Sequence, residues 1–338
     1  MPIFQTLDRR HLMLGSAALA ASAPLLSHAQ EPSQRDDTVA RPDLTGKTIL
    51  ITGSSSGFGR LGAEHYARLG ARVFATMRNL PRAEADALRE LAERESLEIE
   101  VVEIDVTSDA SVQAGVDTVL DRTGGTLDVL VNNAGIAVTG PVEVQDMTAT
   151  QLIFDTNVMG CHRLVRAVLP AMRAQGSGLI VPVSSQLGRL IIPGIGHYSA
   201  TKFALEAMSE QLAYELVPHG IDVSIIQPGG YPTQIWANQN RYSGALKARS
   251  DAERLAAYPA MTARMGGSDG SGSTTDPMDV PRAIAEIIAM PQGKRPLRRA
   301  VHPTDRPQEA ANAALAEAQI AFLGESPYGP AIKAVHGS

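Results

Sequence analysis

The stretch Thr52-Gly53-Ser54-Ser55-Ser56-Gly57-Phe58-Gly59 follows an apolar run, Thr48-Ile49-Leu50-Ile51, and leads into a helix-forming segment. Glycines allow the backbone to turn tightly and to come close to a bound group. The N-terminus of the following helix offers free N–H groups and a positive dipole end to phosphates. A strand, a glycine-rich turn and a helix in this order therefore predict a dinucleotide site. On these residues alone, the alternative is a Gly/Ser-rich connecting loop.

The composition bounds the classes of protein to consider. The 338 residues are 44% hydrophobic and 20% charged, which is typical of a globular chain with a large core. The net charge is −6 without a basic stripe, so we expect no nucleic-acid partner. Cys161 is the single cysteine, which excludes an intrachain disulfide and a cysteine-based metal cluster. The eight histidines lack ligand spacing, so we expect no metal.

Residues 1–29 have the pattern of a bacterial export signal. Arg9-Arg10 precedes an apolar run and the small-residue sequence Ser27-His28-Ala29, as in a twin-arginine signal peptide that is cleaved after export. The apolar run of about 16 residues is short for a membrane span, so we expect none after signal removal. We therefore predict contact with the export machinery and a periplasmic location. The alternatives are an uncleaved anchor, or a chance arginine pair in a cytoplasmic protein. Residues 30–43 are polar and are predicted to be a linker.

From Leu44 onward, apolar strand-like runs alternate with helical patterns. We expect strands at 48–52, 72–76, 97–104, 127–131, 178–183, 221–226 and, more weakly, 297–301. The intervening helices are expected at 58–69, 81–94, 108–122, 148–173 and 197–218. This alternation predicts an α/β fold: a single domain at 44–305 with a Rossmann-type, doubly wound parallel sheet of about seven strands and helices on both faces. The helix-prone segment 231–276 is expected to form a substrate loop, and 306–338 a C-terminal extension with a helix at 309–322.

The strongest candidate for catalysis is the pair Tyr198 and Lys202. Residues four apart share one face of a helix, so the phenol and the ammonium would project together. A positive charge beside a phenol favours the phenolate, which makes the pair suitable for general acid–base chemistry. Taken alone, this spacing is a weak signal and is more typical of a surface Tyr and Lys on an amphipathic helix. Ser185 ends the strand 178–183, where its hydroxyl could donate to a substrate oxygen.

Polar residues also end the neighbouring strands. Asn132-Asn133-Ala134-Gly135 closes the strand at 127–131, and Asp105-Val106 closes the one before it. Ligands of open α/β sheets bind at these carboxyl ends. Each of these residues could have a structural role, but their joint order indicates one site.

Together with T-G-x-x-x-G-x-G, these motifs resemble the classical short-chain dehydrogenase/reductase family over about Leu44 to Val301. The resemblance implies a tetrad in which Tyr198 exchanges the proton, Lys202 favours its phenolate form and holds the nicotinamide ribose, Ser185 binds the reacting oxygen and Asn157 positions a relay water. It also implies a dimer or tetramer that pairs helices 148–173 and 197–218. The implied cofactor-binding residues are Gly53, Ser55, Ser56, Gly57, Phe58, Gly59, Arg78, Asp105, Val106, Asn133, Ala134, Gly135, Tyr198, Lys202, Pro228, Gly229 and Thr233.

The choice of cofactor follows from charge. An acidic residue about 20 positions after the glycines binds ribose hydroxyls and repels a 2′-phosphate. This chain has no carboxylate there and places Arg78 at the end of the strand, where a guanidinium suits a phosphate. We therefore predict NADP(H) in preference to NAD(H). The alternative for Arg78 is a solvated strand end, and the segment 54–56 lacks a basic residue that many NADP-preferring relatives have.

The substrate is expected to be a hydrophobic or aromatic carbonyl or alcohol. The expected substrate residues are Ser185, Gln186, Pro193, Tyr198, Tyr231 and Trp236. Local sequence at 73–78 is similar to the steroid- and retinoid-type branch of the family. The sequence thus predicts an NADP(H)-dependent oxidoreductase, with a catalytically idle, NADP(H)-binding regulatory protein of the same fold as the alternative.

Overall fold

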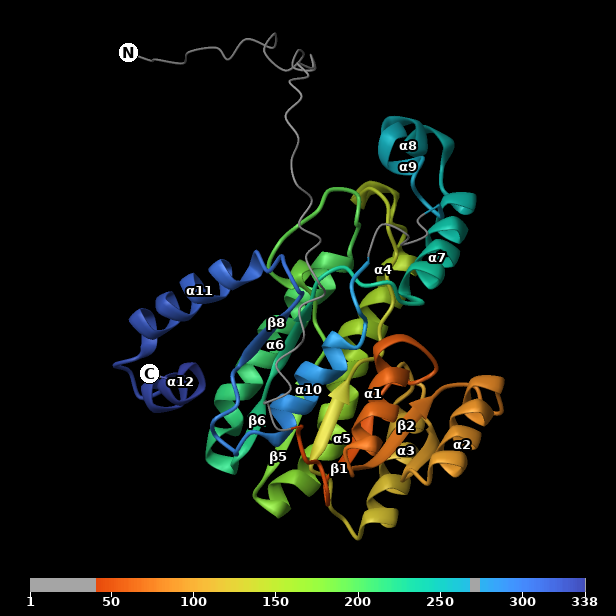
Figure 1. The fold of residues 1–338 in the computed structure, drawn as a ribbon. Helices are drawn as coiled ribbons and strands as arrows, with labels where there is room; N and C mark the ends of the chain where they lie inside the picture. Colours follow the sequence, from red (N-terminus) through yellow and green to blue (C-terminus); the bar gives the residue numbers. More distant parts are fainter. Residues whose placement is uncertain (1–40, 268–273, 338) are drawn as a thin grey trace, which may run out of the picture. The chain divides into compact units, whose positions relative to one another are not determined.

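A computed structural model describes residues 41–267 and 274–337, and residues from Pro42 onward form one unit. The predicted signal at 1–29 and most of the predicted linker lie outside the described residues. The strands are β1 Thr48–Ile51, β2 Arg72–Met77, β3 Ile99–Glu103, β4 Val129–Asn132, β5 Gly178–Pro182, β6 Ile221–Val223, β7 Ile225–Pro228 and β8 Arg298–Val301. The helices are α1 Gly57–Arg68, α2 Ala83–Glu95, α3 Asp109–Thr123, α4 Met147–Phe154, α5 Gly160–Gln175, α6 Tyr198–Leu216, α7 Ile235–Arg249, α8 Ala252–Ala257, α9 Pro259–Thr262, α10 Asp279–Ala289, α11 Gln308–Leu323 and α12 Gly329–His336 (Figure 1).

The strands form the predicted parallel sheet. Six of them lie in the order β3-β2-β1-β4-β5-β6, and β7 pairs with β8, all in parallel. The expected strand at 221–226 is divided at Ser224, because β6 pairs with β5 whereas β7 pairs with β8. A backbone hydrogen bond of 2.7 Å from Ser184 to Ile226 nevertheless links β7 to the segment after β5. The strand order reverses between β1 and β4, which creates the crevice where such sheets bind ligands.

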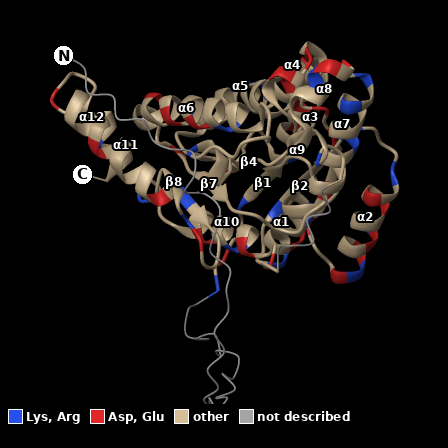
Figure 2. Cartoon of the chain, turned by 90° about the horizontal axis from the view of Figure 1, so that it is seen from above, with Lys and Arg blue, Asp and Glu red and all other residues tan. Residues whose placement is uncertain are grey.

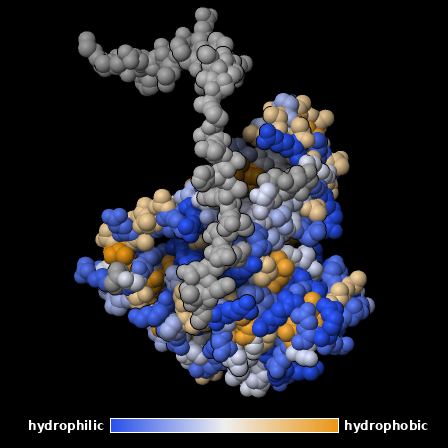
Figure 3. All heavy atoms as spheres, viewed as in Figure 1, coloured by the Kyte–Doolittle hydropathy of each residue, from blue (hydrophilic) through white to orange (hydrophobic). Residues whose placement is uncertain are grey.

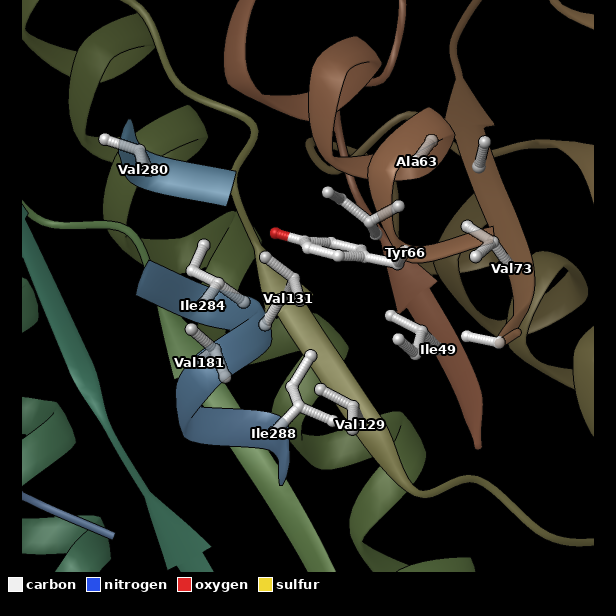
Figure 4. Packing of buried hydrophobic residues seen from close by; sticks show 14 of the residues in the cluster. Ile49, Ala63, Tyr66, Val73, Val129, Val131, Val181, Val280, Ile284 and Ile288 are labelled. Atoms are coloured by element: carbon white, nitrogen blue, oxygen red, sulfur yellow. The ribbon is translucent and has the colours of Figure 1, made fainter. Parts of the chain in front are cut away.

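Helices cover the sheet on both faces, as predicted. Seen from above, α1 and α10 lie on one side of the strands and α3, α5 and α6 on the other (Figure 2). Each side has its own apolar core, because a parallel sheet buries both of its faces. In the first core, the fully buried Tyr66 of α1 extends toward α10 beside Val131 of the sheet, and Ile284 lies beyond Val131 (Figure 4).

Two predicted helices differ in detail from the structure. The expected helix at 148–173 is interrupted by a π-helical turn, Asp155–Met159, between α4 and α5. The C-terminal extension contains α12 in addition to the expected helix, and α12 packs against α6 through a 2.8 Å contact between His336 Nε2 and the Tyr214 hydroxyl. In the described part of the chain, no helix has both the length and the apolar character needed to cross a bilayer. On the face shown in Figure 3, hydrophilic residues predominate and hydrophobic ones form separate small areas.

Candidate active site

The glycine-rich turn after β1 packs directly against the segment that follows β4. Thr52 Oγ1 accepts hydrogen bonds of 3.0 Å from the N–H groups of both Asn133 and Ala134. Gly53 has a φ of +71°, and a Cβ there would lie 2.9 Å from Ala134 Cα. A Cβ on Gly59 would lie 2.3 Å from the Gly53 oxygen and 2.5 Å from Asn133 Nδ2. Glycine is therefore required at both positions for this close approach of backbones.

Beside this turn, at the carboxyl ends of the strands, lies a cavity of about 670 Å³. The predicted residues that line it are Gly53, Ser55, Ser56, Gly57, Phe58, Arg78, Asp105, Val106, Asn133, Ala134, Gly135, Ser185, Gln186, Tyr198, Lys202, Pro228, Gly229, Tyr231, Thr233 and Trp236. Gly59 and Asn157, both buried, are not among the lining residues. Pro193 was expected in the lining but is not part of it: its side chain is exposed, and its neighbours Ile192 and Ile195 line the cavity instead.

Tyr198 and Lys202 occupy the first turn of α6, on the same face as predicted. The Lys202 side chain is buried, and its Nζ donates a 2.9 Å hydrogen bond to the carbonyl oxygen of Val183. The same ammonium lies 5.7 Å from the centre of the Tyr198 ring. Two residues after Val183, the Ser185 hydroxyl accepts a 3.0 Å hydrogen bond from the Leu187 N–H, which fixes its side chain at the start of a short 3₁₀ turn. The lysine thus connects the phenol to the strand end that bears Ser185.

Asn157 lies in the π-helical turn and braces the site from behind. Its Oδ1 accepts a 2.8 Å hydrogen bond from the Ile136 N–H, and its Nδ2 donates one of 2.9 Å to the Ile136 oxygen. A third bond of 3.1 Å joins Nδ2 to Thr201 Oγ1 on α6. The side-chain amide therefore ties the segment after β4 to the helix of Tyr198, while its expected role toward a relay water stays a prediction.

The other end of the cavity contains Arg78, exposed at the end of β2. Its Nη2 lies 3.4 Å from the hydroxyl of Tyr242, a residue of α7. Near it, the Asp105 carboxylate accepts hydrogen bonds of 3.0 and 2.8 Å from the N–H and hydroxyl of Thr107. Burial on its own would raise the pKa of Asp105, but these bonds and the Arg78 charge outweigh it and hold the pKa below its ordinary value.

Leu187, which the sequence also predicts as a lining residue, does line the cavity. The lining further includes residues that the sequence did not single out by position, although those from 234 to 242 fall in the expected substrate loop. They are Thr76, Met77, Asn79, Arg82, Glu84, Ile104, Thr107, Ile136, Ala137, Thr156, Val183, Ser184, Ile192, Ile195, Gly230, Gln234, Ile235, Asn238, Gln239, Arg241 and Tyr242. Part of this set had a detectable signal: Ile235, Asn238, Gln239 and Tyr242 have the i, i+3, i+4, i+7 spacing of one helix face. That spacing identifies a face of the helix, but it does not indicate what the face contacts.

The residues present fit a nicotinamide dinucleotide. The close packing around Gly53 and Gly59 leaves backbone rather than side chains at the turn, as a pyrophosphate requires. Phe58 and Tyr231 meet edge to face, with ring centres 5.5 Å apart, beside this turn. Among the described residues, no group of three or more His, Cys, Asp or Glu side chains is arranged to hold a metal ion.

Residues 47–243 match the profile of the short chain dehydrogenase family, and the chain belongs to that family. It is an NAD(P)-dependent oxidoreductase that acts on CH–OH or C=O groups.

Particular relatives extend this comparison. The chain is 35% identical over 259 residues to retinol dehydrogenase 8 of Bos taurus, a match that spans 75% of this chain and 80% of the relative. It is 38% identical over 192 residues to 3-ketodihydrosphingosine reductase of Bacteroides thetaiotaomicron, across 57% of this chain and 66% of the relative. A short-chain dehydrogenase from Streptomyces avermitilis has a similar structure, with 31% identity and a TM-score of 0.64 across 82% of this chain and 96% of that one. One from Burkholderia phymatum, in complex with NAD, has 28% identity and a TM-score of 0.66 across 83% and 96%.

Proposed function

We propose that this chain is an NADP(H)-dependent oxidoreductase that interconverts a carbonyl and a secondary alcohol, with Tyr198 as the general acid and base. The observation that supports the proposal most is the placement of Lys202. Its buried ammonium is held on the Val183 oxygen and lies 5.7 Å from the centre of the Tyr198 ring. A buried cation beside a phenol suits general acid–base catalysis, because the cation is placed to offset the negative charge left by proton transfer.

In reduction, the Tyr198 hydroxyl donates its proton to the carbonyl oxygen of the substrate. The Ser185 hydroxyl donates a hydrogen bond to the same oxygen as negative charge develops on it. In the reverse direction, the Tyr198 phenolate takes the proton of the alcohol. When bound, the nicotinamide supplies or accepts the hydride.

Replacing Tyr198 by Phe tests this mechanism against the alternative of an idle regulatory protein. Loss of a general acid lowers kcat by about 10²- to 10⁴-fold, so Tyr198→Phe should reduce turnover by at least about 100-fold. The dissociation constant for NADPH should stay within about threefold, because the phenol hydroxyl is not part of the phosphate contacts. Tyr328→Phe is the matched control: Tyr328 is 70% exposed between α11 and α12, so turnover should be unchanged. Equal turnover of wild type and Tyr198→Phe would refute the mechanism, and binding without turnover in wild type would favour the regulatory alternative.

The preference for NADP(H) is supported by Arg78 and by the lack of a carboxylate at the end of β2. Structural relatives have been crystallised with NAD and with NADP, so the family accommodates both cofactors. The proposed substrate class is supported by the apolar wall of the cavity, which includes Leu187, Ile192 and Ile195. It is in keeping with relatives named retinol dehydrogenase 8 and 3-ketodihydrosphingosine reductase.

We also propose export through the twin-arginine route and a homodimer or homotetramer. The proposal of export rests on Arg9-Arg10 and the apolar run that follows. An Arg9→Lys, Arg10→Lys variant should stay inside the cell; unchanged export would exclude this route.

The proposal of an oligomer rests on exposed apolar residues in the two expected pairing helices, Met159 beside α5 and Phe203 on α6. Light scattering that gives the mass of one chain would exclude it.

A further inference from the structure

Helix α7 forms one wall of the cavity at the end where Arg78 lies. The opposite wall, after β2, includes Arg78, Asn79 and Arg82, whereas α7 contributes Asn238, Arg241 and Tyr242. The 3.4 Å contact between Arg78 Nη2 and the Tyr242 hydroxyl joins the two walls. These residues are 164 positions apart in the sequence, so the fold alone brings them together.

The three arginines at this end of the cavity differ in whether a carboxylate pairs with them. Arg82 is committed to Glu84 through two hydrogen bonds of 2.9 and 2.8 Å. Within residues 41–267 and 274–337, neither Arg78 nor Arg241 forms an ion pair with a carboxylate. Arg241 instead stacks on the Tyr242 ring, with its guanidinium carbon 4.9 Å from the ring centre, and its Nη2 donates a 3.4 Å hydrogen bond to Asn238 Oδ1. The stacked ring holds one face of the guanidinium, and the neutral amide partner leaves its charge available to an anion.

We propose that Arg241 is a second ligand of the cofactor 2′-phosphate, so that Arg78 and Arg241 hold this phosphate between β2 and α7. Two guanidiniums suit a dianionic phosphate, because each donates charge-assisted hydrogen bonds in a planar fork. The inference rests on the proposed preference for NADP(H). It adds a second residue that would determine cofactor specificity. This residue lies outside the end of β2, which is the position from which sequence patterns predict that specificity.

Helix α7, which bears Arg241, also reaches the middle of the cavity. The segment that leads into α7 begins beside the glycine-rich turn, where the Cβ direction of Gly57 points to Thr233 Cβ at 3.4 Å. The same helix lines the cavity with Ile235 and Trp236, two residues of the expected substrate loop. A phosphate held by Arg241 would therefore hold α7 along the cofactor.

The test measures binding rather than turnover. Dissociation constants of NADPH, NADH, 2′,5′-ADP and AMP are determined by calorimetry for wild type, Arg78→Ala, Arg241→Ala and Lys247→Ala. Lys247 is the matched control, because it removes one positive charge from the same helix without lining the cavity. Arg241→Ala should weaken NADPH and 2′,5′-ADP about tenfold, and should leave NADH and AMP within about twofold. Lys247→Ala should leave all four constants unchanged, and high salt should reduce the effect of Arg241.

The outcomes separate this inference from the proposed cofactor preference. If Arg78→Ala abolishes the advantage of NADPH while Arg241→Ala behaves like Lys247→Ala, the role of Arg241 is refuted and the preference stands. Equal weakening of NADPH and NADH by Arg241→Ala would also refute it, since the residue would then act on the loop and not on the phosphate. If wild type binds NADPH and NADH equally, the cofactor preference itself fails, and the phosphate site with it.

Discussion

At the residue scale, the tightest requirement in the site falls on Gly59. A side chain there would meet the Gly53 oxygen at 2.3 Å, and this oxygen belongs to backbone that cannot rotate away. Gly59→Ala should therefore lower the free energy of unfolding by about 1–3 kcal/mol, the usual range for overpacking, and should weaken cofactor binding. Urea unfolding and NADPH calorimetry measure the two effects.

Gly244→Ala is the control for this substitution. Gly244 lies inside α7, and its Cβ direction meets only Gly266 Cα, at 4.0 Å. Because alanine is the better helix former, this change should be neutral or stabilise by up to about 1 kcal/mol. If Gly59→Ala were as stable as Gly244→Ala, this would contradict the close packing of α1 at Gly59 against the backbone of Gly53.

The individual residues that could be predicted are those with fixed spacing in one element. Tyr198 and Lys202 are separated by one turn of a helix. Gly53, Gly57 and Gly59 lie within one short segment after β1. Local sequence spacing is therefore enough to find both groups. Arg241 could not be predicted this way, because its position depends on how α7 returns over the sheet. Pro193 was expected in the cavity, but only its neighbours face it, since the orientation of a loop residue depends on tertiary contacts.

At the element scale, a buried charge network joins α6 to β8 and to the C-terminal extension. Glu206 is fully buried and accepts a 2.9 Å hydrogen bond from Arg298 Nε. One turn later, Glu210 pairs with Arg298 and accepts a 2.5 Å hydrogen bond from the Tyr214 hydroxyl. Arg189, which follows the 3₁₀ turn after Ser185, lies 3.4 Å from Glu206. The network therefore links the helix of Tyr198 to the segment of Ser185.

This network predicts a pH-dependent stability. Burial on its own would raise the pKa of Glu210, but the nearby His336 ring, the charge of Arg298 and the hydrogen bond from Tyr214 hold it well below its ordinary value of 4.5. A depressed carboxyl pKa stabilises the fold above about pH 4.5, and this contribution is lost as the pH falls toward the folded-state pKa. Glu210→Gln should thus lower the free energy of unfolding by about 1–3 kcal/mol at pH 7, and by less as the pH falls below 4.5.

Urea unfolding at several pH values measures the difference between wild type and variant. The control is Glu215→Gln, an exposed position on the same helix, which should change stability by no more than about 0.5 kcal/mol. A difference between wild type and Glu210→Gln that stays constant from pH 7 to pH 3 would contradict the assignment.

The elements themselves were largely predictable, because each combines an apolar pattern with the expected length. The helix at 309–322 was expected and corresponds to α11, but α12 was not. Nor did the sequence indicate that the extension docks on α6, since its contacts lie between residues such as Tyr214 and His336, 122 positions apart. The π-helical turn at Asn157 was missed for a similar reason: no residue pattern marks it.

At the scale of the whole molecule, the doubly wound sheet determines where the site lies. The strand order reverses between β1 and β4, and Gly53 and Asn133, which follow these two strands, both line the cavity. The parallel order was predictable from the alternation of strands and helices. Two features depend on long-range contacts that no local pattern encodes. One is that β6 pairs with β5 whereas β7 pairs with β8, and the other is the position of α7 beside Arg78.

We propose that the chain reduces hydrophobic carbonyls with NADPH. The most direct test of this activity is initial-rate oxidation of NADPH and NADH by the purified protein, with aliphatic, aromatic, steroid and retinoid carbonyls as substrates. We expect turnover with at least one hydrophobic class and a kcat/KM for NADPH at least about tenfold above that for NADH, since a phosphate contact contributes about 1.4 kcal/mol or more. Tight NADPH binding without turnover on any of these carbonyls would contradict the proposed activity.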